Sequence, residues 1–136
     1  MGDFSQNGII SNLHDFGTKT TADIEKELVK FSKERKMELI LPSLYSELKG
    51  DALPNIVKRI GETKYLNHII IGLDKASKAE AIKAWKFFKK LKTPFTILWN
   101  DGPRLKKLQE ELKEKGLAPS EMGKGRNVWY CLGMCI

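Results

Sequence analysis

The chain has 136 residues, of which 41% are apolar, and a net charge of +7. This length predicts one domain with enough chain to bury a core. No apolar run approaches the ~20 residues that a membrane-spanning helix needs. The sequence also lacks a basic region followed by an apolar core, the mark of a signal peptide. Composition therefore favours a soluble, cytoplasmic protein over membrane-embedded or secreted classes.

Much of the positive charge lies in one segment, because residues 75–92 contain seven lysines. The apolar residues of this segment recur at helical spacing: Ala81, Ala84, Trp85, Phe88 and Leu91. We therefore expect Trp85 and Phe88 in the core and the lysines on the solvent face of a helix. No DNA- or RNA-binding motif accompanies the lysines, so nucleic acid is not an expected partner.

Residues 1–36 are expected to form an N-terminal arm followed by a helix. The first 21 residues are polar and mixed, with a short apolar fragment at residues 8–14. Ile24, Leu28 and Phe31 then recur at i, i+4 and i+7, which predicts an amphipathic helix over residues 21–35.

A first strand is predicted over residues 37–41, and we expect it to end at Pro42, which has no amide hydrogen to donate. After a polar turn, Asp51 is the expected N-cap of a second helix that ends at Gly61. The predicted buried stripe of this helix is Leu53, Ile56, Val57 and Ile60.

The second half repeats the same alternation of strand and helix. A second strand is expected over residues 68–73, a third helix over residues 77–91 and a third strand over residues 95–99. Pro103 opens a fourth helix capped by Gly116. Its expected inward residues are Leu105, Leu108 and Leu112.

A glycine-containing loop and a last helix over residues 127–136 close the chain. Cys131 and Cys135 lie four residues apart in this apolar segment. Two cysteines without further ligands make no structural zinc site, so we predict reduced core thiols.

These elements predict an α/β fold. Strands that are continuous apolar runs are buried on both faces, which is typical of a parallel sheet between two helix layers, a three-layer α/β/α arrangement. Right-handed crossovers place the second strand beside the first and the third beyond it. Ligands of such sheets bind at the carboxyl ends of the strands, where Pro42, Asp74 and Asn100 lie.

The loop Gly123-Lys124-Gly125 is the second candidate for ligand contact. It lacks the spacing of a Walker A loop, and neither serine nor threonine follows its lysine. Two glycines allow close approach of the backbone, the ammonium supplies a point charge for a diphosphate, and a helix starting at Asn127 would add its positive end. The alternative for this tripeptide is a flexible surface turn.

Two motifs together suggest a family. Leu-Pro-Ser-Leu-Tyr-Ser-Glu at the end of the first strand is followed about eighty residues later by Gly-Lys-Gly-Arg-Asn-Val-Trp. In this order and spacing, the sequence resembles the GT-A glycosyltransferases, most closely the glucosyl-3-phosphoglycerate synthase group. The resemblance implies a Rossmann-like sheet of the nucleotide-diphospho-sugar transferase type. Residues 37–136 would then be the N-terminal, nucleotide-sugar-binding part of such a protein.

The resemblance also implies a set of nucleotide-sugar-binding residues: Pro42, Ser43, Leu44, Glu47, Asp74, Gly123, Lys124 and Gly125. The first three would line the base and ribose, Asp74 would contact the nucleoside, and Lys124 would lie near the nucleotide. The family's Asn-Glu pair is replaced here by Tyr45-Ser46, with Glu47 one place later.

Enzymes of the GT-A type hold a divalent metal, magnesium or manganese, with an Asp-x-Asp motif at the end of the next strand. No aspartate follows Gly123 in this sequence. We therefore expect the metal ligands, the catalytic residues and the acceptor site outside this chain. Residues 37–136 would be an incomplete domain and inactive alone. The first strand would have an open edge, so self-association into a homo-oligomer is expected.

The function implied by the resemblance is transfer of a sugar from a nucleoside diphosphate to a small acceptor, such as a phosphoglycerate-type hydroxy acid. One alternative is another α/β nucleotide binder, such as a nucleotidyltransferase, although that class places its glycine-rich loop directly after the first strand. The other is a non-enzymatic module that binds an acidic partner through its lysine-rich helix.

Overall fold

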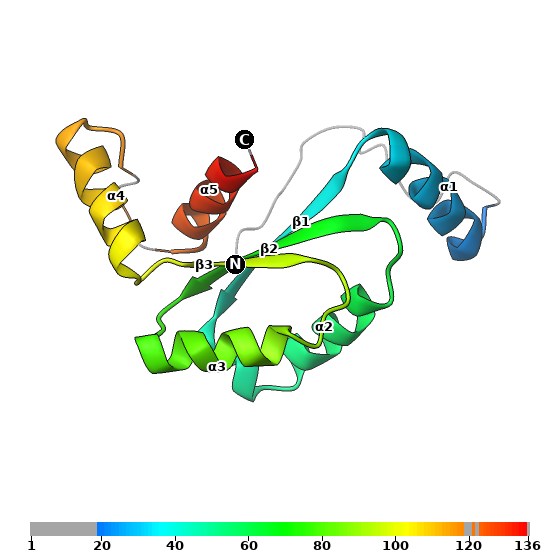
Figure 1. Ribbon diagram of the computed structural model, residues 1–136, viewed down its shortest axis with the longest axis horizontal. Helices are drawn as coiled ribbons and strands as arrows, with labels where there is room; N and C mark the ends of the chain where they lie inside the picture. Colours follow the sequence, from blue (N-terminus) through cyan, green and yellow to red (C-terminus); the bar gives the residue numbers. More distant parts are fainter. Residues whose placement is uncertain (1–18, 119–120, 122, 136) are drawn as a thin grey trace, which may run out of the picture.

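The computed structural model describes residues 19–118, 121 and 123–135, so the predicted N-terminal arm lies largely outside the described residues. A three-stranded parallel sheet forms the centre of the protein (Figure 1). Its strands are β1 (Met37–Leu44), β2 (Leu66–Asp74) and β3 (Phe95–Trp99), in the order β1-β2-β3. Both pairs of neighbouring strands are parallel. The predicted α/β class, the parallel sheet and the strand order are confirmed.

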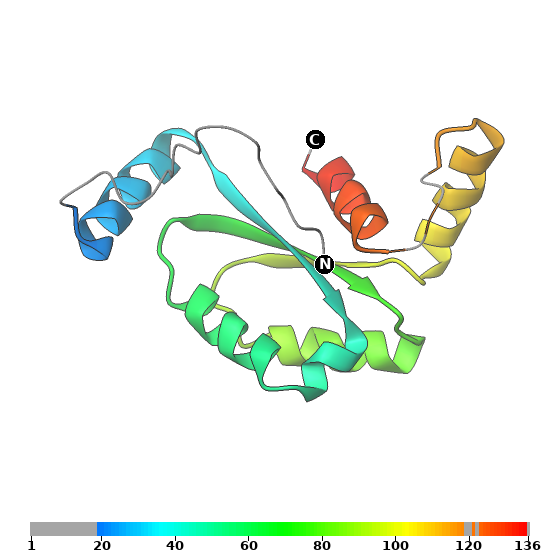
Figure 2. The same ribbon diagram turned by 180° about the vertical axis from the view of Figure 1, so that it is seen from behind.

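Helices cover both faces of the sheet. On one face lie α2 (Ala52–Gly61) and α3 (Lys78–Phe88), and on the other lie α4 (Pro103–Glu114) and α5 (Lys124–Met134) (Figures 1 and 2). A short 3-10 helix, η1 (Tyr45–Lys49), joins β1 to α2, and α1 (Thr21–Glu34) lies beyond the other end of β1. None of the helices in the described part of the chain is long and apolar enough to cross a membrane.

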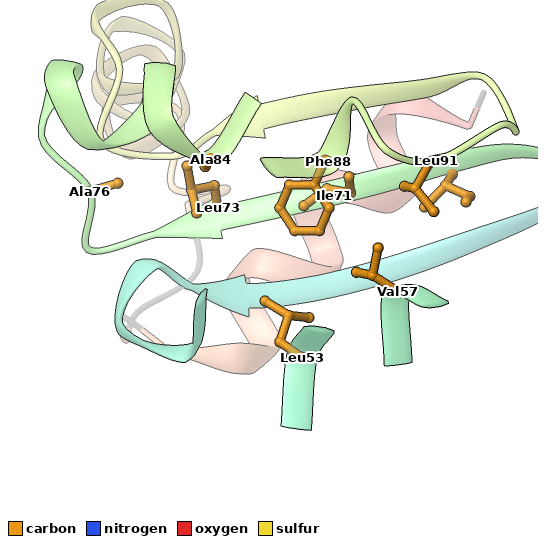
Figure 3. Close-up of a cluster of buried hydrophobic side chains, with 9 residues drawn as sticks. Leu53, Val57, Ile71, Leu73, Ala76, Ala84, Phe88 and Leu91 are labelled. Carbon is orange, nitrogen blue, oxygen red and sulfur yellow. The ribbon is translucent and has the colours of Figure 1, made fainter. Parts of the chain in front are cut away.

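The side chains of β2 alternate between two buried clusters, as the period of two along a strand requires. Ile69, Ile71 and Leu73 pack toward α2 and α3, where Phe88 is central (Figure 3). Ile70 faces the opposite side. It belongs to a smaller cluster with Leu98, Tyr130 and Cys131. Because β2 is covered on both faces, its sequence is a continuous apolar run rather than an alternating one.

The prediction that Pro42 ends the first strand was wrong. The strand runs on to Leu44, and Pro42 pairs with Gly72 of β2. Among the described residues β1 has a strand neighbour on one side alone. A proline is tolerated on such an edge strand if its missing N–H would face away from the neighbour. This extension carries Ser43 and Leu44 to the carboxyl end of the sheet.

Several apolar side chains predicted to be inside are exposed. They are Ile24 and Phe31 of α1, Ile56 of α2, Trp85 of α3, Leu108 of α4, and Cys135 after α5. Each helix of α2–α5 packs one stripe on the sheet, and no further layer of described residues covers the outer face. Trp85 follows the buried Ala84 by one position, a rotation of about 100° that turns it outward. There the ammonium of Lys89 lies 5.2 Å from the centre of its ring.

The predicted start of α3 at Ser77 is confirmed by a capping box. The N–H of Ser77 donates to Oε2 of Glu80 over 2.8 Å, and the N–H of Glu80 donates to Oγ of Ser77 over 3.4 Å. The backbone hydrogen bond from Ser77 is the largest cause that lowers the pKa of Glu80 below its ordinary value.

This capping box predicts an acid-sensitive contribution to stability. A lowered folded-state pKa means that the stabilisation is present above the unfolded pKa of Glu80 and is lost as pH falls through the folded pKa. Urea titrations of the Glu80→Gln variant should therefore show lower stability than the parent at pH 7, and a difference that vanishes in acid. Glu110→Gln, an exposed glutamate of α4, is the matched control. A difference independent of pH would contradict the assignment.

Candidate functional site

A pocket of about 510 Å³ opens at the carboxyl ends of β1 and β2, beside the first turn of α5. Three segments line it, and their residues are Leu41, Pro42, Ser43, Leu44, Glu47, Asp74, Lys75, Gly123, Lys124, Arg126 and Asn127. Seven of the eight residues implied by the family resemblance are in this lining, and Gly125 is the exception. The structure thus brings both motifs to one place, while the binding role of each residue stays a prediction.

The helix α5 begins earlier than predicted. It starts at Lys124, with Gly123 as its N-cap, so the predicted glycine loop is the first turn of the helix. None of the described side chains caps this end. The first N–H groups of a helix have no partner within it, and the helix dipole is positive there. An uncapped N-terminus beside a pocket is suited to an anion.

Close packing between α5 and β2 positions this helix. The side-chain amide of Asn127 donates to the carbonyl of Gly72 over 2.8 Å, and Asn127 is 2% exposed. The thiol of Cys131 in turn donates to Oδ1 of Asn127 over 3.5 Å. Burial raises the pKa of Cys131 to about 11, so the thiol keeps its proton at neutral pH. This anchor needs a glycine at position 72, because any side chain there would occupy the space of Asn127.

Asp74 lines the pocket and forms a buried ion pair. Its Oδ1 atom accepts from Nη2 of Arg126 over 3.2 Å and from the side-chain amide of Asn100 over 2.9 Å. The two charged side chains are 8% and 4% exposed, respectively. Glu47, the other carboxylate of the pocket, accepts from the N–H of Leu44 over 2.8 Å. Glu47, which stands one place later than the glutamate of the family's pattern, is therefore present at the site, in the first turn of η1.

The charges of the pocket favour an anion. Lys75, Lys124 and Arg126 outnumber Glu47 and Asp74, and both carboxylates already accept hydrogen bonds from the protein. Within the described ranges no three His, Cys, Asp or Glu side chains gather into a group that could hold a metal. With Asp74 neutralised by Arg126, the acids of this pocket do not fit a divalent cation. Two residues of the pocket lining have a buried polar atom without a described partner: the Oγ of Ser43, which is 3% exposed, and the Nε of Arg126.

Sequence reasoning missed four lining residues: Leu41, Lys75, Arg126 and Asn127. Arg126 and Asn127 stand directly after the Gly-Lys-Gly tripeptide, so extending that motif by one helical turn would have found them. Lys75 follows Asp74 with a φ of 54°, a left-handed conformation that is uncommon for a residue other than glycine. No sequence pattern indicated that conformation.

Comparison with known proteins gives two curated relatives. The chain is 43% identical over 136 residues to a glucosyl-3-phosphoglycerate synthase of Persephonella marina, covering all of this chain and 34% of the relative. It is 32% identical over 126 residues to a glucosyl-3-phosphoglycerate synthase of Methanococcoides burtonii, covering 92% of this chain and 31% of that protein. The chain is related in sequence to the glucosyl-3-phosphoglycerate synthases. The resemblance seen in the two motifs is thereby confirmed.

The similarity to the glucosyl-3-phosphoglycerate synthases extends over nearly all of this chain but over only part of each relative. It spans about a third of the length of the relatives. No protein-family model matches the chain. No solved structure matches it either.

Proposed function

We propose that this chain is the nucleotide-sugar-binding part of a glycosyltransferase. Its donor would be a nucleoside diphosphate sugar, and its acceptor a small phosphoglycerate-type hydroxy acid. The names of the two relatives support this class of activity. The main structural support is that Lys124 and the uncapped N-terminus of α5 line the same pocket as the carboxyl end of β1.

The pocket suggests how such a donor would lie. Pro42, Ser43 and Leu44 would line the base and ribose, and Asp74 would face the nucleoside. The diphosphate would then lie at the first turn of α5, near Lys124. A leaving diphosphate gains negative charge as the bond to the sugar breaks. A fixed helix end and an ammonium stabilise that charge most if they are already in place.

Magnesium or manganese would add positive charge at the diphosphate. The ligands that hold this metal would not be among the described residues. Residues 37–136 would form the nucleotide-binding unit. A cytoplasmic location and self-association through the open edge of β1 remain predictions.

Lys124→Ala should weaken the binding of a nucleoside diphosphate by about 1–3 kcal/mol, the range for a hydrogen bond to a charged group. Isothermal calorimetry with uridine, guanosine and adenosine diphosphates measures this loss. The matched control is Lys106→Ala, an exposed lysine on α4 away from the pocket lining. Equal affinity of the Lys124 variant and the parent would remove Lys124 from the site. The absence of any nucleotide binding by the parent would overturn the proposed function.

A further inference from the structure

The guanidinium of Arg126 lies where α5 meets the carboxyl end of β2. Besides the 3.2 Å contact to Asp74, its Nη1 is 3.4 Å from Oε1 of Gln109 on α4. The guanidinium carbon is 6.0 Å from the centre of the Tyr130 ring. Arg126 lines the pocket, yet its Nε is buried without a described partner. Three elements therefore hold this side chain, and it in turn holds Asp74.

The carboxylate of Asp74 is restrained from two directions. Arg126 of α5 and Asn100, which follows β3, both donate to the same oxygen, Oδ1. Its Oδ2 has no hydrogen-bond partner among the described residues, and Asp74 is part of the pocket lining. A carboxylate held by one oxygen presents the other as an oriented acceptor.

Stability alone does not account for this arrangement. Desolvating two charges costs free energy that their attraction often fails to recover, so an apolar pair of similar volume is frequently as stable. Two donors on one oxygen do more for orientation than for stability. Hydrogen-bonded side chains inside a protein restrict one another's orientation, so this network also fixes the direction of the Asp74 carboxylate.

We propose that Arg126 and Asn100 are positioning residues that aim Oδ2 of Asp74 at a hydrogen-bond donor of the nucleoside, a base N–H or a ribose hydroxyl. This inference rests on the proposed function. It divides the pocket into two parts. Lys124 and the N-terminal end of α5 bind the diphosphate. The charge of Arg126 is neutralised by Asp74, so Arg126 affects the binding of the nucleoside alone.

The Arg126→Lys variant separates these two roles. Lysine keeps the positive charge but lacks the planar fork that contacts Asp74 and Gln109 together. Affinity for a nucleoside diphosphate should fall about tenfold, the loss of one charge-assisted hydrogen bond. Affinity for inorganic pyrophosphate, which has no nucleoside, should stay unchanged. A merely structural role would weaken both ligands together.

Calorimetry of the whole chain tests this, using the tightest-binding of uridine, guanosine and adenosine diphosphate beside pyrophosphate. Arg104→Lys, an exposed arginine at the start of α4, is the matched control. Asn100→Ala removes the second donor from another element and should give the same selective loss, so it carries the test if Arg126→Lys fails to fold. In an Asp74→Asn background, Arg126→Lys should cost little more, because the carboxylate that it positions is gone.

Two results would overturn the inference while leaving the proposed function intact. One is an equal loss for pyrophosphate and nucleoside diphosphate in the folded variants. The other is parental affinity for both ligands. A parent chain that binds pyrophosphate and none of the nucleoside diphosphates would instead overturn the proposed function, and this inference with it.

Discussion

Replacing Gly72 by alanine is expected to detach α5 from the sheet. An alanine Cβ at this position would lie 1.6 Å from Oδ1 of Asn127 and 2.7 Å from Sγ of Cys131. Both neighbours are buried, so neither can swing into solvent. Overpacking costs about 1–3 kcal/mol or more, and the carbonyl of Gly72 would also lose its partner, at about 1–3 kcal/mol. Urea unfolding should therefore show a loss above about 3 kcal/mol.

The Gly72 variant should also lose affinity for nucleoside diphosphates, since the first turn of α5 lines the pocket. Gly133→Ala in the same helix is the matched control, because among the described residues nothing outside its chain neighbours and its own helix backbone lies within 4 Å of a Cβ there. Replacing a helical glycine by alanine should leave stability equal or slightly higher. Adding Asn127→Ala to Gly72→Ala should restore part of the stability by removing the nearest clash. A Gly72→Ala protein as stable as the parent would show that α5 is not anchored in this way.

The sheet was predictable because its signals are local. Runs such as Ile69-Ile70-Ile71 are typical of strands covered on both faces, and β2 is buried on both sides. The clustering of seven predicted site residues has an equally simple origin. The carboxyl ends of parallel strands meet at one edge, so Pro42, Ser43 and Asp74 are brought together once the topology is known. The expected binding roles of these residues came from the family resemblance, because a hydrophobic periodicity carries no information about roles.

What could not be predicted depends on contacts between distant residues. Arg126 reaches Asp74 across 52 positions, and Asn127 reaches Gly72 across 55. No local pattern specifies which arginine will pair with which aspartate. The extension of β1 past Pro42 likewise depends on the neighbours of that strand, which among the described residues lie on one side alone, and this is a property of the whole sheet. The contacts of Arg126 and Asn127 hold α5 beside the pocket. The sequence therefore predicted where the site lies but not the contacts that position α5 there.

The exposed and buried aromatic residues of α3 give the sharpest comparison of stability. Phe88 is fully buried in the cluster between α3 and the sheet, whereas Trp85 is 48% exposed three positions earlier (Figure 3 shows Phe88 in the cluster). Phe88→Ala should cost about 3–5 kcal/mol, because it opens a cavity at the centre of the core.

Trp85→Ala on the same helix is the control for Phe88→Ala. It should cost about 1 kcal/mol or less, the value of its exposed contact with Lys89. Both substitutions remove an aromatic ring from one helix and leave alanine, the best helix former, so helix propensity cannot produce the difference. Urea titration of the two variants at neutral pH measures it directly. Equal losses would mean that the outer face of α3 is covered in solution. In that case, Trp85 would be part of an interface rather than an exposed side chain among lysines.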